Sequence, residues 1–290
     1  MHASFDQRAS FFGKEGSLIE AWNADVVLDG TWKYDGFFGE GGVQDKKLHI
    51  NNNATLRGGW KVGDSVLIES FGYDPDFYAD YALQGARPGE LLPFVGVPTL
   101  ANLDYVLSLS TPDYKHLSVS GNAVWGKDEN FDEWSSANIL FATLQVDWRP
   151  TEKLRLNALY NLQQYKRRSD GSLVGQRRIP RLKLEYQASR SIFGRLIAEY
   201  DARYQDSLRD DSRTEAPILI RDDSGLFQPA LGSRQNGLRL DALFAWQPTP
   251  GTVFFAGYGS SLRENDPFAF RQLSRSGDGF FVKFSYLFRL

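Results

Sequence analysis

The sequence predicts an all-β fold: a transmembrane up-and-down antiparallel β-barrel of about 14 strands, complete or partial. Three observations lead to this prediction. Apolar residues recur at every second position along most of the 290-residue chain, short and long connections alternate between the expected strands, and tryptophans gather towards strand ends. A period of two is the signature of a strand with one apolar face. We expect residues 1–290 to form a single domain.

The composition excludes several classes of protein. The chain has no cysteine, which rules out a disulfide framework and thiolate chemistry. Its net charge is −3, too balanced to indicate a nucleic-acid partner. No apolar run approaches the ~18 residues that a transmembrane helix needs. The mean hydropathy of −0.40 resembles that of a soluble protein, but alternating strands hide their apolar half in such an average.

The first residues do not resemble a leader sequence. Residues 1–6 contain neither a basic n-region nor an apolar h-region. We therefore expect a signal peptide to be absent from this sequence, which is then either that of a cytoplasmic protein or a mature or truncated piece of a longer one. Residues 3–12 already alternate as a strand would, although this is the weakest of the expected strands.

The remaining strands are expected in regular succession. Asp29-Gly30 is a hairpin signal that predicts a turn, followed by a short strand at Trp32 and Tyr34. The later alternating segments are residues 48–60, 66–68, 103–109, 117–125, 140–148, 154–162, 182–188, 196–204, 238–246, 254–258 and 279–290.

The connections are more diagnostic than the strands. The short turns are expected at residues 29–30, 62–64, 111–114, 149–152, 189–192 and 247–250. The long loops are expected at residues 71–99, 127–137, 168–179, 205–236 and 263–278. Short periplasmic turns opposite long extracellular loops are typical of outer-membrane barrels, whereas soluble sandwiches mix loop lengths at both ends. Turn signals at 74–78 and 87–89 predict that the first long loop is ordered or folded inward, where it could constrict a pore.

The closing strand carries large apolar residues on one parity. These are Phe280, Val282, Phe284, Tyr286, Phe288 and Leu290. The strand resembles the C-terminal assembly signal of bacterial outer-membrane barrels, which implies the barrel-assembly machinery as a partner. Taken alone, the same strand also fits the last strand of a soluble sandwich. Trp60, Trp148 and Trp246 beside the short turns favour the barrel, because aromatic girdles mark membrane interfaces.

The opposite parity of the strands is polar and of mixed charge. We expect it to line a lumen that faces away from outer-membrane lipid and lipopolysaccharide, and to bind or pass a small polar solute. The expected lumen-lining residues are Arg155, Arg181, Lys183, Glu185, Arg195, Glu199, Asp201, Arg203, Arg239, Asp241 and Lys283.

A family resemblance rests on the Trp-x-Pro turns at residues 148–150 and 246–248, together with the ending at 281–290. These motifs resemble a group of outer-membrane barrels that follow a family-nine carbohydrate-binding-like domain and are classed as the domain of unknown function 5916 family. The resemblance is best over roughly the C-terminal two-thirds of the chain. It implies a location in the cell outer membrane and suggests oligosaccharide or glycan-derived solutes. It also implies an N-terminal periplasmic domain, which we expect to be absent from this sequence, so that the chain would be the barrel or part of it.

Covalent chemistry finds little support in the sequence. No Gly-x-Ser-x-Gly elbow, His-Glu-x-x-His pair, P-loop or dinucleotide fingerprint occurs, so we assign no catalytic, metal or cofactor residues and expect no cofactor. One alternative is a surface hydrolase that uses His49 with loop carboxylates. The candidate loop carboxylates are Asp74, Asp76, Asp210, Asp211, Asp222 and Asp223. Another alternative is the C-terminal barrel part of a TonB-dependent receptor.

Overall fold

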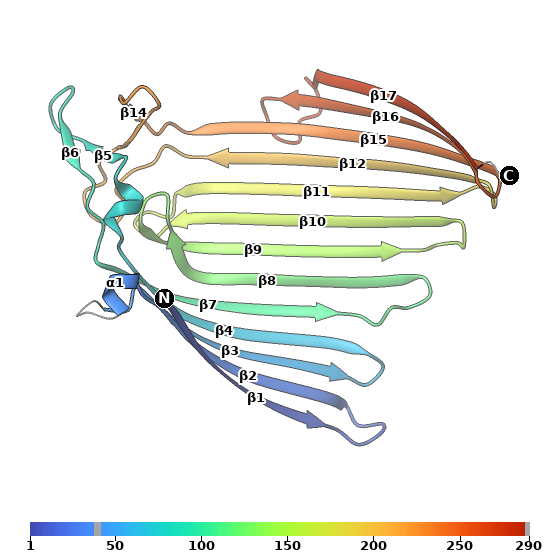
Figure 1. Ribbon diagram of the computed structural model, residues 1–290, viewed down its shortest axis with the longest axis horizontal. Helices are drawn as coiled ribbons and strands as arrows, with labels where there is room; N and C mark the ends of the chain where they lie inside the picture. Colours follow the sequence, from blue (N-terminus) through green and yellow to red (C-terminus); the bar gives the residue numbers. More distant parts are fainter. Residues whose placement is uncertain (38–41, 288–290) are drawn as a thin grey trace.

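The computed structural model describes residues 1–37 and 42–287. Its main element is a 13-stranded antiparallel sheet in which neighbouring strands also follow one another along the chain (Figure 1). These strands are β1 (His2–Phe12), β2 (Ile19–Thr31), β3 (Asp45–Leu56), β4 (Trp60–Gly72), β7 (Thr99–Ser110), β8 (Leu117–Asn130), β9 (Ser135–Trp148), β10 (Leu154–Arg167), β11 (Leu173–Gln187), β12 (Ile192–Gln205), β15 (Ser233–Thr249), β16 (Thr252–Glu264) and β17 (Ser274–Tyr286).

A small 4-stranded sheet, which we call the cap together with the loops that carry it, lies at one end of the large sheet (Figure 1). Its strands are β5 (Tyr81–Gln84), β6 (Leu91–Pro93), β13 (Ile218–Arg221) and β14 (Phe227–Pro229). The described chain also contains the helical turn α1 (Tyr34–Phe37) and the 3-10 turn η1 (Pro75–Tyr78). No helix among the described residues has the length and apolar character needed to cross a membrane.

The longest connections lie at the cap end of the large sheet and the shortest at the other end, but the predicted strict alternation of short and long holds only in part. The 131–134 and 168–172 connections at the cap end are no longer than the 13–18 and 111–116 turns at the other end, because residues 173–179 of the predicted 168–179 loop belong to β11. The predicted turn at residues 62–64 is wrong, since these residues lie inside β4. Because each strand runs antiparallel to its neighbours, successive connections must alternate between the ends. The turn end holds residues 13–18, 57–59, 111–116, 149–153, 188–191 and 250–251. The cap end holds residues 73–98, 131–134, 168–172, 206–232 and 265–273. The predicted 127–137 loop is shorter than expected, since β8 and β9 stay paired up to Asn130 and Ser135.

The predicted hairpin turn at Asp29-Gly30 is wrong. Both residues lie inside β2, where they pair with Ser4 and Ala3 of β1, and the turn falls at residues 13–18 instead. The expected short strand at Trp32 and Tyr34 is also wrong, because Tyr34 begins α1. Gly30 serves close packing: a Cβ there would lie 2.8 Å from the Trp32 ring. Pairing along the whole of β1 therefore overrides the local turn signal.

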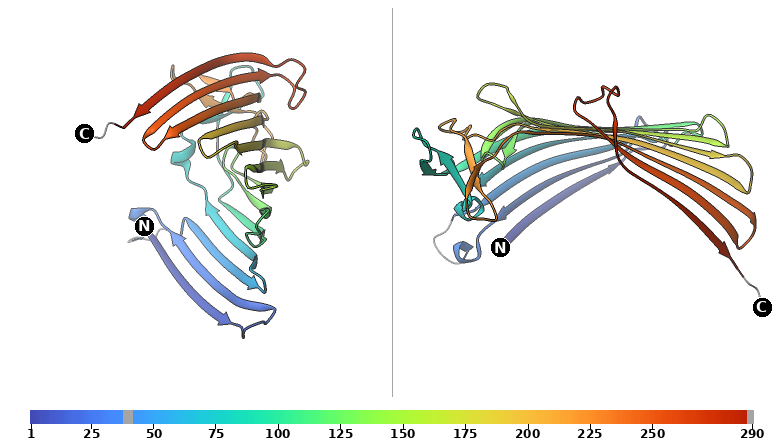
Figure 2. Two further views of the ribbon diagram at one scale, coloured as in Figure 1. Left: turned by 90° about the vertical axis from the view of Figure 1, so that its right-hand side faces the viewer. Right: turned by 90° about the horizontal axis from the view of Figure 1, so that it is seen from above.

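Each face of the large sheet keeps one character from edge to edge. On the first four strands, Arg8, Asp25, Asn51 and Ser65 are cross-strand neighbours and therefore share one face. The same pairing continues this polar face as far as β17. The other parity is mainly apolar, although close to the cap end it also carries Arg178, Arg234 and Glu264. The sheet is strongly curved, with the cap inside the curve (Figure 2). Since the cap packs on Phe71 and other side chains of the polar parity, the polar face is concave and the apolar face convex.

The closing strand confirms the predicted alternation as far as it is described. Phe280, Val282, Phe284 and Tyr286 lie on the convex face and are between 53% and 83% exposed. Phe288 and Leu290 lie outside the described residues. Within the described chain, β1 pairs only with β2 and β17 only with β16, so the large sheet has two edges. The large sheet thus has thirteen strands where the sequence indicated about 14.

Candidate functional site: the charged concave face

The predicted lumen-lining residues all share the concave face. Their registers connect Arg155 to Glu185 and Arg195, for example, and Arg181 to Glu199. The complete set is Arg155, Arg181, Lys183, Glu185, Arg195, Glu199, Asp201, Arg203, Arg239, Asp241 and Lys283. Successive side chains of a strand point to opposite faces of the sheet, so the parity of a residue was enough to predict its face.

Many of these charges are paired across or along the strands. The N–O distances are 3.5 Å for Arg181 with Glu199, 3.2 Å for Lys183 with Glu185 and 3.0 Å for Arg239 with Asp241. Two further pairs use partners that were not predicted: Arg155 lies 2.6 Å from Asp147, and Arg177 lies 2.6 Å from Asp201. The two latter pairs are fork-shaped, with two guanidinium nitrogens on one carboxylate.

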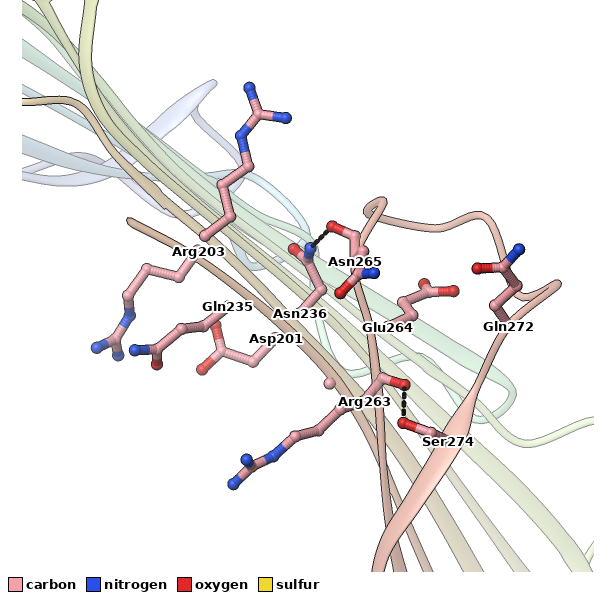
Figure 3. A pocket seen from close by; sticks show the side chains of 11 residues that line it. Asp201, Arg203, Gln235, Asn236, Arg263, Glu264, Asn265, Gln272 and Ser274 are labelled. Carbon is pink, nitrogen blue, oxygen red and sulfur yellow. Dashed lines mark hydrogen bonds between the residues drawn. The ribbon is translucent and has the colours of Figure 1, made fainter. Parts of the chain in front are cut away.

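Two hollows follow the concave face along β12, β15 and β16. The first has a volume of about 670 Å³ and gathers five of the predicted residues, which are Arg181, Arg195, Glu199, Arg239 and Asp241. The second, about 720 Å³, lies nearer the cap end, where Asp201, Arg203 and Arg263 contribute from the concave face, whereas Arg234 and Asn236 at its border belong to the opposite parity (Figure 3). The walls of the second hollow are mostly polar, whereas Ile197, Leu243 and Phe281 add apolar walls to the first.

Three arginines of these hollows give them a positive character. Among the described residues, Arg195, Arg203 and Arg263 have no carboxylate oxygen within 4.0 Å. Their guanidinium groups therefore remain available to an external anion. The sequence reasoning missed Arg263 because it was assigned to a loop, whereas β16 extends to Glu264.

The cap is held by an aromatic core at the inner rim of the sheet. Tyr73 and Tyr78 stack at 5.4 Å between ring centroids, and Trp134 meets the Tyr78 ring edge-on at 5.8 Å. The indole Nε1 of Trp134 also donates to the carbonyl of Val97 at 2.7 Å. Strand β5 pairs with β13, so the loops 73–98 and 206–232 form one unit. The prediction that the first long loop is ordered and folded inward is thus confirmed.

A buried ionic network fastens this unit to the sheet. The guanidinium of Arg167 lies 2.6 Å from Glu133 and 2.6 Å from Asp206, and its Nη2 also donates to the carbonyl of Ser207. The backbone amide of Arg209 donates to Glu133 as well. Burial raises the pKa of the Glu133 carboxyl, while the hydrogen bonds from Arg167 and Arg209 act in the opposite direction. No pattern in the sequence marks these residues, which lie far apart along the chain.

The structure does not bring His49 to the loop carboxylates. The His49 ring lies 2.7 Å from Glu69 on the neighbouring strand β4. Most of the loop acids have local partners. Asp74 and Asp76 accept from Lys33, Asp210 accepts from Thr214, Asp211 from Ser169 and Arg209, and Asp222 from Ser224; Asp223 is exposed. These acids therefore stabilise loops, and the hydrolase alternative has no histidine–loop-carboxylate pair behind it.

Comparison with known proteins adds no relative. A scan against protein-family models finds no match, and a search of the curated proteins finds none either.

Proposed function

We propose that this protein forms the wall of an outer-membrane β-barrel that binds or passes a polar solute along its concave face. The observation that carries the proposal is the convex face, which leaves large apolar side chains exposed on strands from β1 to β17, outside the patch around Tyr200 that Phe268 and Phe270 cover. Representative exposures are 58% for Phe5, 49% for Leu107, 47% for Leu196 and 66% for Phe284. A continuous apolar surface of this extent calls for an apolar covering.

Lipid is the covering that best fits this distribution. A soluble sandwich would bury the apolar face beneath a second sheet, but the described second sheet lies inside the curve, against the polar face. Trp148 and Trp246 stand on the convex side at the turn end and are 48% and 45% exposed. Aromatic residues in such positions are typical of a membrane–water interface. The proposed partners are accordingly outer-membrane lipid, lipopolysaccharide and the barrel-assembly machinery.

The concave face suggests the chemistry of the solute. Arg195, Arg203 and Arg263 present forked donors that match carboxylate and phosphate groups, and the amides beside them suit hydroxyl groups. We therefore propose a polar solute with an anionic group, with acidic glycan fragments as the leading class. The cap restricts access from its own end, because its aromatic core sits inside the curve of the sheet.

Depth-dependent fluorescence quenching tests the proposal. The protein would be folded into phospholipid vesicles whose acyl chains carry bromine at different depths. We expect strong quenching of the wild type by bromine near the headgroups, and a large loss of that quenching in a Trp148→Phe/Trp246→Phe variant.

The cap tryptophan provides the matched control. Trp134 is 3% exposed and lies in the aromatic core, so Trp134→Phe should leave the brominated-lipid quenching unchanged. The same sample should also migrate differently on gels before and after boiling. A protein that stays in solution without detergent, is not quenched by brominated lipid and migrates identically when boiled would overturn the membrane proposal.

A further inference from the structure

Carboxylates from two strands converge on the concave face close to the cap end. Glu69 comes from β4, and Asp128 and Glu129 come from β8, with β7 between them. One oxygen from each of the three lies within 4.8 Å of the other two. Like charges at such distances repel strongly in a partly buried setting, unless a proton or a metal cation neutralises part of the charge.

The protein supplies very little positive charge to this group. Among the described residues, neither Asp128 nor Glu129 has a lysine, arginine or histidine nitrogen within 4.0 Å, and Glu69 has only His49. The amide nitrogen of Asn102 donates to Glu129 at 2.6 Å and to Asp128 at 3.4 Å. One neutral amide cannot offset the charge of the cluster, so the site is short of positive charge.

Two buried oxygens beside the cluster have no partner. Asp104 is 1% exposed and Asn102 is 4% exposed, and within the described part of the chain the Oδ1 atom of each accepts no hydrogen bond. A buried acceptor without a donor is costly, which makes such an atom a pointer to a ligand. This observation is independent of the spacing of the three carboxylates.

Asp104 points towards the strand that bears two of the carboxylates. Gly126 of β8 pairs with Asp104, and a Cβ at Gly126 would lie 2.6 Å from Asp104 Oδ1 and 2.3 Å from the Leu103 carbonyl oxygen. Gly126 has a φ of +149°. The missing side chain at this position leaves room for the Asp104 carboxylate against β8, two residues from Asp128.

We propose that Glu69, Asp128 and Glu129 bind a Ca²⁺ ion, with the free oxygens of Asp104 and Asn102 completing the donor set. The donors are all oxygens, the ligands that hard divalent cations prefer. Ca²⁺ binds oxygen at 2.3–2.6 Å, so two of its ligands can be separated by up to about 5 Å. The three carboxylate oxygens all lie within 4.8 Å of one another, close enough to share one such ion. Ca²⁺ also accepts flexible, all-protein oxygen donor sets, whereas Mg²⁺ demands near-ideal octahedral geometry and usually keeps several waters.

The ion would join β4 to β8 directly beneath the loop 73–98. Such a bond crosses β7 and adds to the hydrogen bonds of the sheet. A ligand that binds only the folded state stabilises it in proportion to the logarithm of its concentration above Kd. We therefore expect the melting temperature of the protein to rise with Ca²⁺ and to fall when a chelator is added.

Terbium luminescence and calorimetry test the site. The protein would be folded in detergent, free of lipopolysaccharide, stripped with a chelator and titrated with Tb³⁺, which replaces Ca²⁺ and is excited through a nearby tyrosine or tryptophan. Calorimetry with Ca²⁺ alone should give one site with Kd between about 1 μM and 1 mM, the range of sensor and extracellular sites. Ca²⁺ should displace the Tb³⁺ signal at far lower concentration than Mg²⁺.

Matched variants distinguish Ca²⁺ binding at this site from non-specific binding to the other carboxylates of the concave face. Asp128→Asn/Glu129→Gln should abolish saturable binding, yet match or exceed the wild-type melting temperature in chelator, because the variant loses the repulsion. Glu199→Gln/Asp241→Asn removes two carboxylates of the same face that already have arginine partners, and it should bind Ca²⁺ as the wild type does.

Two results would overturn the proposal. One is the absence of saturable Ca²⁺ binding by the wild type up to about 10 mM, beyond the weakest extracellular sites. The other is unchanged binding by Asp128→Asn/Glu129→Gln. Because the wild-type titration decides the matter by itself, a folding defect in a variant does not leave the question open. The titration also needs no lipid, so its failure is distinct from a failure of the membrane proposal.

Discussion

Arg167 and Glu133 form an ion pair that is sealed from solvent: Nη2 lies 2.6 Å from Oε1, and the two side chains are 1% and 0% exposed. The pair joins the end of β10 to the 131–134 connection, and through Asp206 and Arg209 it also joins the loop 206–232. The attachment of the cap to the sheet is thus ionic as well as aromatic.

Breaking this pair should be costly. Glu133→Gln leaves the Arg167 guanidinium buried with less countercharge, and loss of one partner of a buried pair destabilises by about 3–5 kcal/mol. We expect urea unfolding in detergent to shift by that amount, or the 206–232 loop to become sensitive to protease at unchanged sheet content. The control is Asp241→Asn, whose partner Arg239 is 68% exposed. That change should cost less than about 1 kcal/mol, and equal costs would contradict the assignment.

Adjacent residues of β12 should respond oppositely to a charge. Leu196 is 47% exposed on the convex face, and Ile197 faces the concave hollow. In phospholipid vesicles Leu196→Arg should destabilise the fold by about 2–4 kcal/mol if the position is near the bilayer centre. Ile197→Arg should be tolerated, because its guanidinium reaches the polar face. The check is equilibrium unfolding in vesicles. A larger penalty for Ile197→Arg would assign the wrong face to lipid.

Charge reversal at Arg195 should change ion preference. The side chain lies in the 670 Å³ hollow and has no carboxylate partner among the described residues. We expect Arg195→Glu to shift the reversal potential across a planar bilayer towards cation preference, since rings of side-chain charge set pore selectivity. Arg195→Lys should keep the wild-type value. An open pore whose reversal potential ignores both changes would show that this hollow is not on the ion path.

Acid should release one attachment of the first long loop. Lys33 Nζ lies 2.7 Å from Asp74, and this hydrogen bond holds the pKa of Asp74 below its usual value. A carboxyl with a lowered pKa adds stability above the unfolded pKa, about 4, and that stability is lost as the pH falls through the lowered value. The protection of residues 73–80 against hydrogen exchange, taken relative to the intrinsic exchange rate at each pH, should therefore fall below about pH 4.

The Asp74→Asn variant gives the comparison for the acid effect. It lacks the charged pair at every pH, so its exchange should already be faster at pH 7 and should show a smaller acid step. If the wild type and the variant share the same acid step, another group controls the loop.

Local alternation predicted the strands and both faces, because the position of a residue along a strand fixes the face on which its side chain lies. The placement of Arg239 and Asp241 needed nothing more than parity. The cap could not be predicted in this way: β5 pairs with β13, where Leu83 meets Ile218, and no local signal records so distant a contact. The same holds for Arg167 and Glu133. Asp29-Gly30 shows the converse, a strong local signal that pairing with β1 overrides.

The odd number of strands in the large sheet sets a direction at its edges. β1 and β17 both run from the cap end to the turn end, so a direct bond between them would make a parallel pair in a sheet that is otherwise antiparallel. A strand that joins either edge in the antiparallel manner must run from the turn end to the cap end. One such strand could satisfy both edges at once, whereas a strand of the opposite polarity would satisfy neither. Whatever its side chains, a strand can therefore extend this sheet at either edge in the antiparallel manner only if it runs from the turn end to the cap end.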